Sequence, residues 1–293
     1  MDTDRFGNRF APGLPYARGR ILAGTEDDFS RLRRAWRIIE RRIQKDGPES
    51  VFNFSGLERS LPLEAGELPL ADDEIAPALY GERLRELALD HLGGSSRLHD
   101  VMLFNRLTAA TIAVHLALVK RDDAVIGVSP SYSHPTVVRA ARHVGATFVD
   151  TSSVHAFAAA LEREGRVTLV ALTRLAVTYD LLPLDVIREV VRLAHDRGAL
   201  VYVDDAGGAR VGPAVFGQPR MLELGADVGA TGLDKYGTVG PRLGLLAGEK
   251  SLVARISARA FEFGLEARPM LYGAAVRSLE GPCGRWRATR PSV

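Results

Sequence analysis

The chain has 293 residues, of which 46% are hydrophobic and 25% charged, a composition typical of a water-soluble globular protein. Its 38 basic and 36 acidic residues nearly cancel, so net charge gives little attraction toward nucleic acid or an anionic membrane. The single cysteine argues against disulfides, and we expect no metal site. No stretch approaches the roughly 18 apolar residues of a helix that spans a membrane, and the acidic start is unlike a secretory signal. We therefore expect a cytoplasmic protein without membrane contact.

The first predicted element is an amphipathic helix over 26–45, where apolar residues recur at helical spacing among arginines and acids. Residues 51–56 are expected to form a short strand or an extended segment, followed by a loop to about residue 77. A helix over 82–92, closed by two glycines, then leads into a short buried strand over 101–104.

From there strands and helices alternate. Strands are predicted at 124–128, 147–149, 167–172 and 199–203, and helices between them at 135–144, 154–164 and 183–197. This alternation predicts an α/β fold, with a mostly parallel sheet covered by helices on both faces. In such folds ligand-binding groups lie at the C-terminal ends of the strands.

Composition changes abruptly after Glu280, where glycine, proline and arginine dominate. Two interpretations remain open: a disordered basic tail, or the loss or replacement of a C-terminal domain. We therefore expect an N-terminal helical segment over 1–50, an α/β large domain over 51–260, and over 261–293 the remnant of a truncated small C-terminal domain with an atypical tail.

An acid and a lysine in a fixed order suggest a cofactor. Asp204 stands at the end of the apolar strand 199–203, and Lys235 follows in a glycine-rich turn. Pyridoxal phosphate needs a lysine amine for its Schiff base and a carboxylate that keeps its ring nitrogen protonated. Asp205 competes for the carboxylate role, but we favour Asp204 because it continues the buried strand. Alone, either acid is as well explained as a turn former.

The phosphate of such a cofactor needs a third site. The strand at 101–104 runs into a helix start that carries Arg106 and Thr108. Free N–H groups at a helix start, with the helix dipole, bind phosphate. The alternative is plain capping of the helix by Thr108.

Other residues follow strand ends and are candidates for ligand contacts. His134 is our choice for stacking on the pyridine ring, with Tyr132 as the alternative. Thr173 and Arg174 follow the strand at 167–172 and can reach a ring oxygen or a substrate carboxylate. Arg210 is a further candidate for an anionic group of the substrate. Read alone, each of these residues also fits an ordinary turn or surface position.

Together these segments resemble a known family. The chain resembles the fold-type I, aspartate-aminotransferase-like pyridoxal phosphate proteins in four motifs. These are Asn105-Arg106-x-Thr108, Ser131-Tyr132-Ser133-His134-Pro135, the run from Val203 to Arg210, and Asp234-Lys235 through Gly240-Pro241. More narrowly, they resemble the selenocysteine synthase (L-seryl-tRNA(Sec) selenium transferase) branch, including its archaeal-type relatives. The resemblance covers about 51–279.

The resemblance implies a site and a reaction. It implies a Schiff base on Lys235, pairing of the ring nitrogen with Asp204, and phosphate contacts by Arg106, Leu107, Thr108, Ala109 and Thr231. It also implies β-elimination or β-replacement on an amino acid or aminoacyl substrate, in a homodimer or larger homo-oligomer. The mixed charges of the first helix do not support a tRNA partner.

Two other functions stay open. One is a pyridoxal phosphate-dependent lyase or aminotransferase that acts on a small amino acid or amino sugar. The other is a shortened protein that binds the cofactor without catalysis.

Overall fold

The computed structural model describes residues 25–281, which fall into two units. The first unit ends at Gly56, and the second begins at Leu57 and contains the sheet. In the first unit, helix α1 (Thr25–Asp46) agrees with the helix expected over 26–45, and the short helix η2 (Pro48–Ser50) follows it. No strand forms over 51–56.

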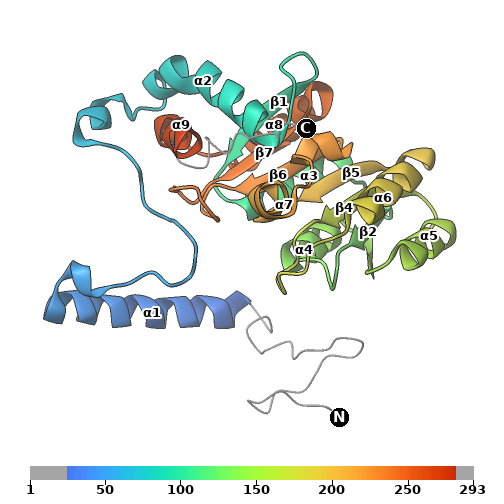
Figure 1. Cartoon of the computed structure of the whole chain (residues 1–293), viewed down its shortest axis with the longest axis horizontal. Helices are drawn as coiled ribbons and strands as arrows, with labels where there is room; N and C mark the ends of the chain where they lie inside the picture. Colours follow the sequence, from blue (N-terminus) through green and yellow to red (C-terminus); the bar gives the residue numbers. More distant parts are fainter. Residues whose placement is uncertain (1–24, 282–293) are drawn as a thin grey trace, which may run out of the picture. The chain divides into compact units, whose positions relative to one another are not determined.

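The second unit is built on a seven-stranded sheet with the order β1-β7-β6-β5-β4-β2-β3 (Figure 1). Its strands are β1 (His99–Phe104), β2 (Ala124–Val128), β3 (Thr147–Thr151), β4 (Val167–Thr173), β5 (Leu200–Asp204), β6 (Val228–Gly232) and β7 (Gly244–Glu249). Strands β2 to β6 pair in parallel, whereas β7 is antiparallel to both of its neighbours. The predicted mostly parallel sheet is confirmed.

Helices cover both faces of the sheet. The helices are α2 (Ile75–Leu92), α3 (Leu107–Leu118), α4 (Pro135–His143), α5 (Val154–Arg163), α6 (Leu184–Asp196), α7 (Gly208–Phe216), α8 (Lys250–Glu262) and α9 (Tyr272–Glu280), with short turns at η3 (Ala65–Leu70), η4 (Met221–Leu224) and η5 (Pro269–Leu271). One buried cluster joins α2, α5, α6, α7 and α9 to the sheet, and a second joins α3, α4 and α8 to the opposite face.

Side-chain alternation along the strands explains the two clusters. In β5, Val201 and Val203 belong to the first cluster, whereas Tyr202 between them belongs to the second. Continuing this alternation, Asp204 faces the α3 side of the sheet and Asp205 faces the α7 side. The strand therefore separates two adjacent acids by its own geometry.

Three helices differ from the sequence-based expectation. Helix α2 begins at Ile75 rather than at residue 82, because burial of its apolar face outweighs the helix-weakening effect of Gly81. It ends as expected, with Gly93 in the left-handed region (φ 77°) donating its N–H to the carbonyl of Leu89. Helix α8 runs through the expected domain boundary at 260/261, and α9 packs against α2 (Figure 1). Residues 261–281 therefore pack within the sheet-containing unit.

Between residues 25 and 281, none of the helices combines the length and the hydropathy needed to cross a membrane.

Candidate functional site

Three neighbouring parallel strands end in buried polar residues at one edge of the sheet. Asp204 closes β5, Thr173 pairs with it at the end of β4, and Ser129 follows β2. Within the described part of the chain, one oxygen of each side chain lacks a hydrogen-bond partner: Asp204 Oδ1, Thr173 Oγ1 and Ser129 Oγ. Buried polar atoms are rarely left unpaired in folded proteins. The arrangement therefore suits a polar ligand at this edge.

The carboxyl of Asp204 has an unusual pKa. Burial, and then the negative charge of Asp205, raise the pKa of Asp204 to about 7, against the opposing effect of the Lys235 ammonium. A buried carboxylate with an unpaired oxygen needs a cationic or donating partner to stay ionised. A protonated ring nitrogen is such a partner.

Asp205 and Arg174 form a buried ion pair. Both side chains are fully buried, and Arg174 Nε donates to Asp205 Oδ1 over 3.0 Å while its NH2 group contacts Oδ2. Arg174 NH1 also donates to the carbonyl of Pro219. In α7, Cβ atoms at Gly208 or Gly212 would crowd this pair, so the helix can approach it only with glycines at both positions. The predicted role of Arg174 in ligand binding is therefore not supported, and Asp204 is the acid that faces the edge.

Lys235 lies in a tight turn after β6, close to the end of β5. The turn is held by Thr238, whose N–H and hydroxyl both donate to the carbonyl of Lys235. The ring of Tyr236 lies against Gly207, where an added Cβ would come within 2.4 Å of the ring. This contact joins the Lys235 turn to the turn after Asp204. The half-buried lysine is near enough to act on the pKa of both Asp204 and His134.

His134 caps α4 beside this lysine. Its Nδ1 accepts the N–H of Thr136 over 3.2 Å, so the neutral ring carries its proton on Nε2. Burial, the ammonium of Lys235 and Arg139 lower the pKa of His134, which favours a neutral imidazole at pH 7. Lys235 is thus near both Asp204 and His134, which come from two other segments of the chain, and their roles at a cofactor stay predictions.

The loop before His134 depends on an acid that the sequence analysis missed. Asp150 in β3 accepts the N–H of Ser133 over 3.1 Å and its hydroxyl over 2.8 Å. These bonds fix the turn that delivers the histidine. Asp150 belongs to an ordinary strand pattern, and no local signal in the sequence connects it to residue 133.

The start of α3 has free backbone donors. The N–H groups of Ala109 and Ala110 both donate to the carbonyl of Arg106, which leaves those of Leu107 and Thr108 outside the helix's own bonds. Arg106 occupies the N-cap position without a side-chain capping bond, so Thr108 does not cap the helix. A Cβ at Gly244 would lie 2.7 Å from the Arg106 carbonyl, so β7 closely approaches this terminus. The terminus fits an anion.

Arg242 is a second residue that the sequence analysis missed. It lies in the turn into β7, where Asp234 is 3.6 Å away. Burial and the nearby positive charges of Arg106 and Arg59 lower its pKa, against the opposing effect of Asp234. The sequence signal was a lone arginine between Gly240-Pro241 and Leu243-Gly244, seven residues after Lys235. Arg242 adds positive charge near the start of α3.

Thr231 and Arg210 make bonds within the protein. Thr231 is fully buried, and its hydroxyl donates to the carbonyl of Ala206 over 2.9 Å. Arg210 is buried and donates to Thr231 Oγ1 and to the carbonyl of Gly232, at the end of β6. Arg210 therefore supports the end of this strand instead of facing a substrate, which corrects its expected role. A contact between Thr231 and a phosphate stays a prediction.

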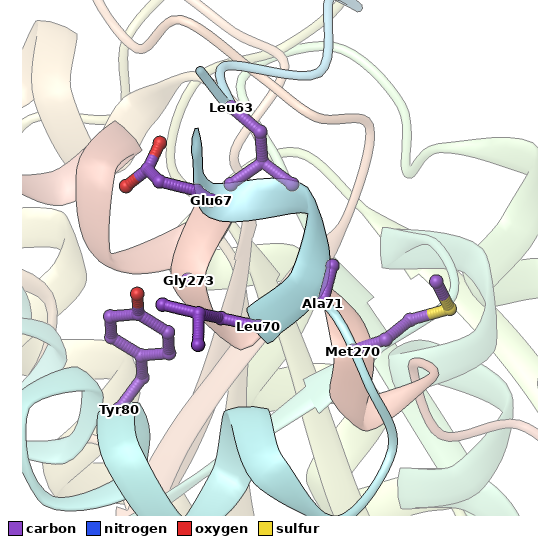
Figure 2. Close-up of a pocket in the computed structure, with 7 residues that line it drawn as sticks. All are labelled: Leu63, Glu67, Leu70, Ala71, Tyr80, Met270 and Gly273. Carbon is purple, nitrogen blue, oxygen red and sulfur yellow. The ribbon is translucent and has the colours of Figure 1, made fainter. Parts of the chain in front are cut away.

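A shallow, mostly apolar depression lies apart from this site (Figure 2). It is lined by Leu63, Glu67, Leu70, Ala71, Tyr80, Met270 and Gly273. Figure 2 shows Leu70 and Tyr80 close together beside Gly273, without any of the polar strand-end residues. Among the described residues no cluster of histidine, cysteine and acidic side chains suits a metal ion.

Comparisons with known proteins agree with this geometry. No model of a known protein family matches the chain. A "UPF0425 pyridoxal phosphate-dependent protein" of Methanothermobacter thermautotrophicus is 34% identical over 261 residues, which are 89% of this chain and 67% of that protein. A protein of the same description from Methanosphaera stadtmanae is 29% identical over 257 residues, 87% of this chain and 65% of that protein.

A solved structure of an apo methionine gamma lyase from Micromonospora echinospora is also similar. It has a TM-score of 0.54 and 25% identity, covering 68% of this chain and 52% of the lyase. The chain thus spans about two thirds of the length of the curated relatives and about half of this lyase. With this similarity in sequence, the chain belongs to the family of UPF0425 pyridoxal phosphate-dependent proteins.

Proposed function

We propose that the chain binds pyridoxal 5′-phosphate at the C-terminal edge of its sheet and catalyses a reaction at the Cα of an amino-group substrate. The observation that carries this proposal is the buried carboxyl of Asp204, with its unpaired Oδ1 and with Lys235 close by. In this proposal Asp204 would accept a hydrogen bond from the protonated ring nitrogen, and Lys235 would form the Schiff base. His134 stacks on the ring as a neutral imidazole.

The start of α3 is the proposed phosphate end of the site. The N–H groups of Leu107 and Thr108 in the first turn of that helix are outside its own bonds, Ala109 follows them, and Arg106 precedes them. Arg242, which pairs with Asp234 at 3.6 Å, adds a second guanidinium near Arg106, and two neighbouring positive charges suit a dianion. Family membership supports the same cofactor.

The proposed reaction is β-elimination or β-replacement on an amino acid or aminoacyl substrate, of the selenocysteine synthase-like type. The cofactor supplies an electron sink for the substrate Cα when it is bound. With the cofactor bound, Lys235 would hold it and would take the proton from the substrate Cα, and Asp204 would keep the ring nitrogen protonated. The resemblance of the motifs supports this choice.

A lyase or aminotransferase acting on a small amino substrate is the second candidate. The structural similarity to a methionine gamma lyase favours the lyase. A protein that holds the cofactor without catalysis is the third candidate. Product analysis with amino acids that carry a leaving group at Cβ or Cγ separates the first two candidates, and absence of any product supports the third.

Covalent labelling of one lysine tests the cofactor assignment. The chain has four lysines, Lys45, Lys120, Lys235 and Lys250. Reduction with borohydride after addition of pyridoxal phosphate should leave a pyridoxyl group on Lys235, located by peptide mass spectrometry. Lys250 begins α8 at the opposite end of β7 from the Lys235 turn, so it should stay unmodified.

The matched variants are Lys235→Ala and Lys250→Ala. We expect the first to lose the label and the visible absorbance of the bound cofactor, and the second to keep both. Equal labelling of all four lysines, or a label that survives in Lys235→Ala, would contradict the proposed site.

A further inference from the structure

Residues 57–60 run alongside the backbone of the Lys235 turn, and we call them the strap. Leu57 pairs with Lys235 in an isolated antiparallel bridge. The N–H of Glu58 donates to the carbonyl of Asp234 over 2.9 Å. The strap is therefore held to the segment that carries the proposed Schiff-base lysine.

The strap is fixed at its other end by a close contact. A Cβ on Gly240 would lie 2.5 Å from the carbonyl oxygen of Ser60, and Gly240 itself has φ +87°. Only glycine combines this left-handed backbone with such a close approach. Arg59 thus lies between Glu58 and Ser60, whose backbones contact Asp234 and Gly240 on either side of Lys235.

The strap brings a third guanidinium to the phosphate end of the site. Arg59 and Arg106 both act on the pKa of Arg242, in the direction expected of neighbouring positive charges. Asp234 is the acid that pairs with Arg242 in the structure, at 3.6 Å. Like charges held together raise the free energy of the folded chain unless an anion lies among them. Arg59 and Arg106 are exposed, so water already screens part of this repulsion, and an anion among the three guanidinium groups would relieve the rest.

We propose that the strap delivers Arg59 to the cofactor's phosphate, as a third guanidinium beside Arg106 and Arg242. This inference rests on the proposed function. A phosphate monoester carries close to two negative charges near neutral pH and has three acceptor oxygens, so it can use arginines in addition to the N–H groups of α3. The contact also explains why residues 57–60 follow the Lys235 turn so closely.

Paired affinities for pyridoxal phosphate and pyridoxal test the proposal, because the two compounds differ only by the phosphate. Arg59→Met should weaken binding of pyridoxal phosphate by about tenfold, the loss of one charge-assisted hydrogen bond, and change binding of pyridoxal less than about twofold. The control is Arg97→Met, since Arg97 is exposed and lies before β1, at the opposite end of that strand from Arg106. It should change neither affinity.

A second variant moves the strap without removing a charge. Gly240→Ala keeps all three arginines but crowds Ser60, so it too should reduce the preference for pyridoxal phosphate over pyridoxal. Equal weakening of both compounds by Arg59→Met would assign Arg59 a purely structural role. Unchanged affinities would show that Arg59 does not reach the phosphate, and either result overturns the proposal.

Borohydride labelling keeps this inference separate from the proposed function. Lys235 should still be labelled in Arg59→Met at saturating pyridoxal phosphate, because the lysine itself is intact. If the unmodified chain is not labelled at Lys235, the proposed function fails and the role of Arg59 fails with it. If labelling occurs but Arg59→Met binds like Arg97→Met, only the role of Arg59 fails.

Discussion

Replacing Asp204 with asparagine should stabilise the cofactor-free protein at pH 8 and weaken its binding of pyridoxal phosphate. Burial and the charge of Asp205 raise the pKa of Asp204 from 3.8 to about 7 in the folded chain. Between these pH values the unfolded chain releases the proton while the folded chain keeps it. The free energy of unfolding therefore falls as pH rises, and the loss is complete above about pH 7. The difference between the two pKa values corresponds to about 4 kcal/mol.

Asparagine carries no titrating proton, so the variant lacks this pH-dependent loss. Unfolding by urea at several pH values between 4 and 8 measures the effect. The free energy of unfolding of Asp204→Asn, relative to the unmodified chain, should increase across that range by up to about 4 kcal/mol. Parallel pH profiles for the two proteins would show that Asp204 is ionised at its ordinary pKa in the fold.

Cofactor affinity should change in the opposite direction. An amide cannot form the charge-assisted bond that a carboxylate makes with a protonated ring nitrogen, which amounts to roughly ten- to hundredfold in affinity. Equilibrium binding of pyridoxal phosphate at pH 8 measures this loss. Tight binding by Asp204→Asn would contradict the assignment of Asp204 to the ring nitrogen, even if the stability prediction held. A carboxyl that lowers stability and raises affinity is expected of a binding site and not of a structural core.

The main architecture could be predicted because it depends on local patterns. Apolar strands near Asp204 and in β2 and β4 alternate with amphipathic helices, and that pattern alone defines an α/β sheet and its ligand edge. The order of Asp204 and Lys235 along the chain then suggested the cofactor. Helix α7 was missed because Gly208, Gly212 and Pro213 are poor helix formers. Its glycines become understandable only when the buried pair beneath them is known.

Parts of the site depend on contacts between distant segments. Arg59 and Arg242 are 183 positions apart in the sequence, yet in the fold the charge of Arg59 lowers the pKa of Arg242. Asp150 likewise fixes the turn at Ser133 from a different strand. Neither pair of residues is linked by a regular sequence spacing, so a single sequence could not predict either contact. Thr108 shows the reverse error, since a good capping residue type was available but Arg106 occupies the capping position.

Substitution of the neighbouring acid, Asp205, should lower the free energy of unfolding, whereas substitution of Asp204 should raise it. Asp205 and Arg174 form a fully buried ion pair with two contacts, so removing one partner leaves an uncompensated charge in the protein interior. Arg174→Met and Asp205→Asn should each lower the free energy of unfolding by about 3–5 kcal/mol. Urea unfolding at pH 7 measures this loss, and Arg166→Met, at an exposed arginine, is the control that should change little.

Combining the two changes distinguishes a charge effect from a packing effect. In Arg174→Met with Asp205→Asn no unpaired charge remains, so the double variant should be more stable than the sum of the two single losses predicts. If the losses simply add, the pair stabilises the fold through separate packing contacts, such as the bond from Arg174 to Pro219 and the approach of α7. Whichever result is found, the two adjacent aspartates differ in their surroundings, because strand alternation directs Asp204 toward the candidate ligand edge and Asp205 toward an internal arginine.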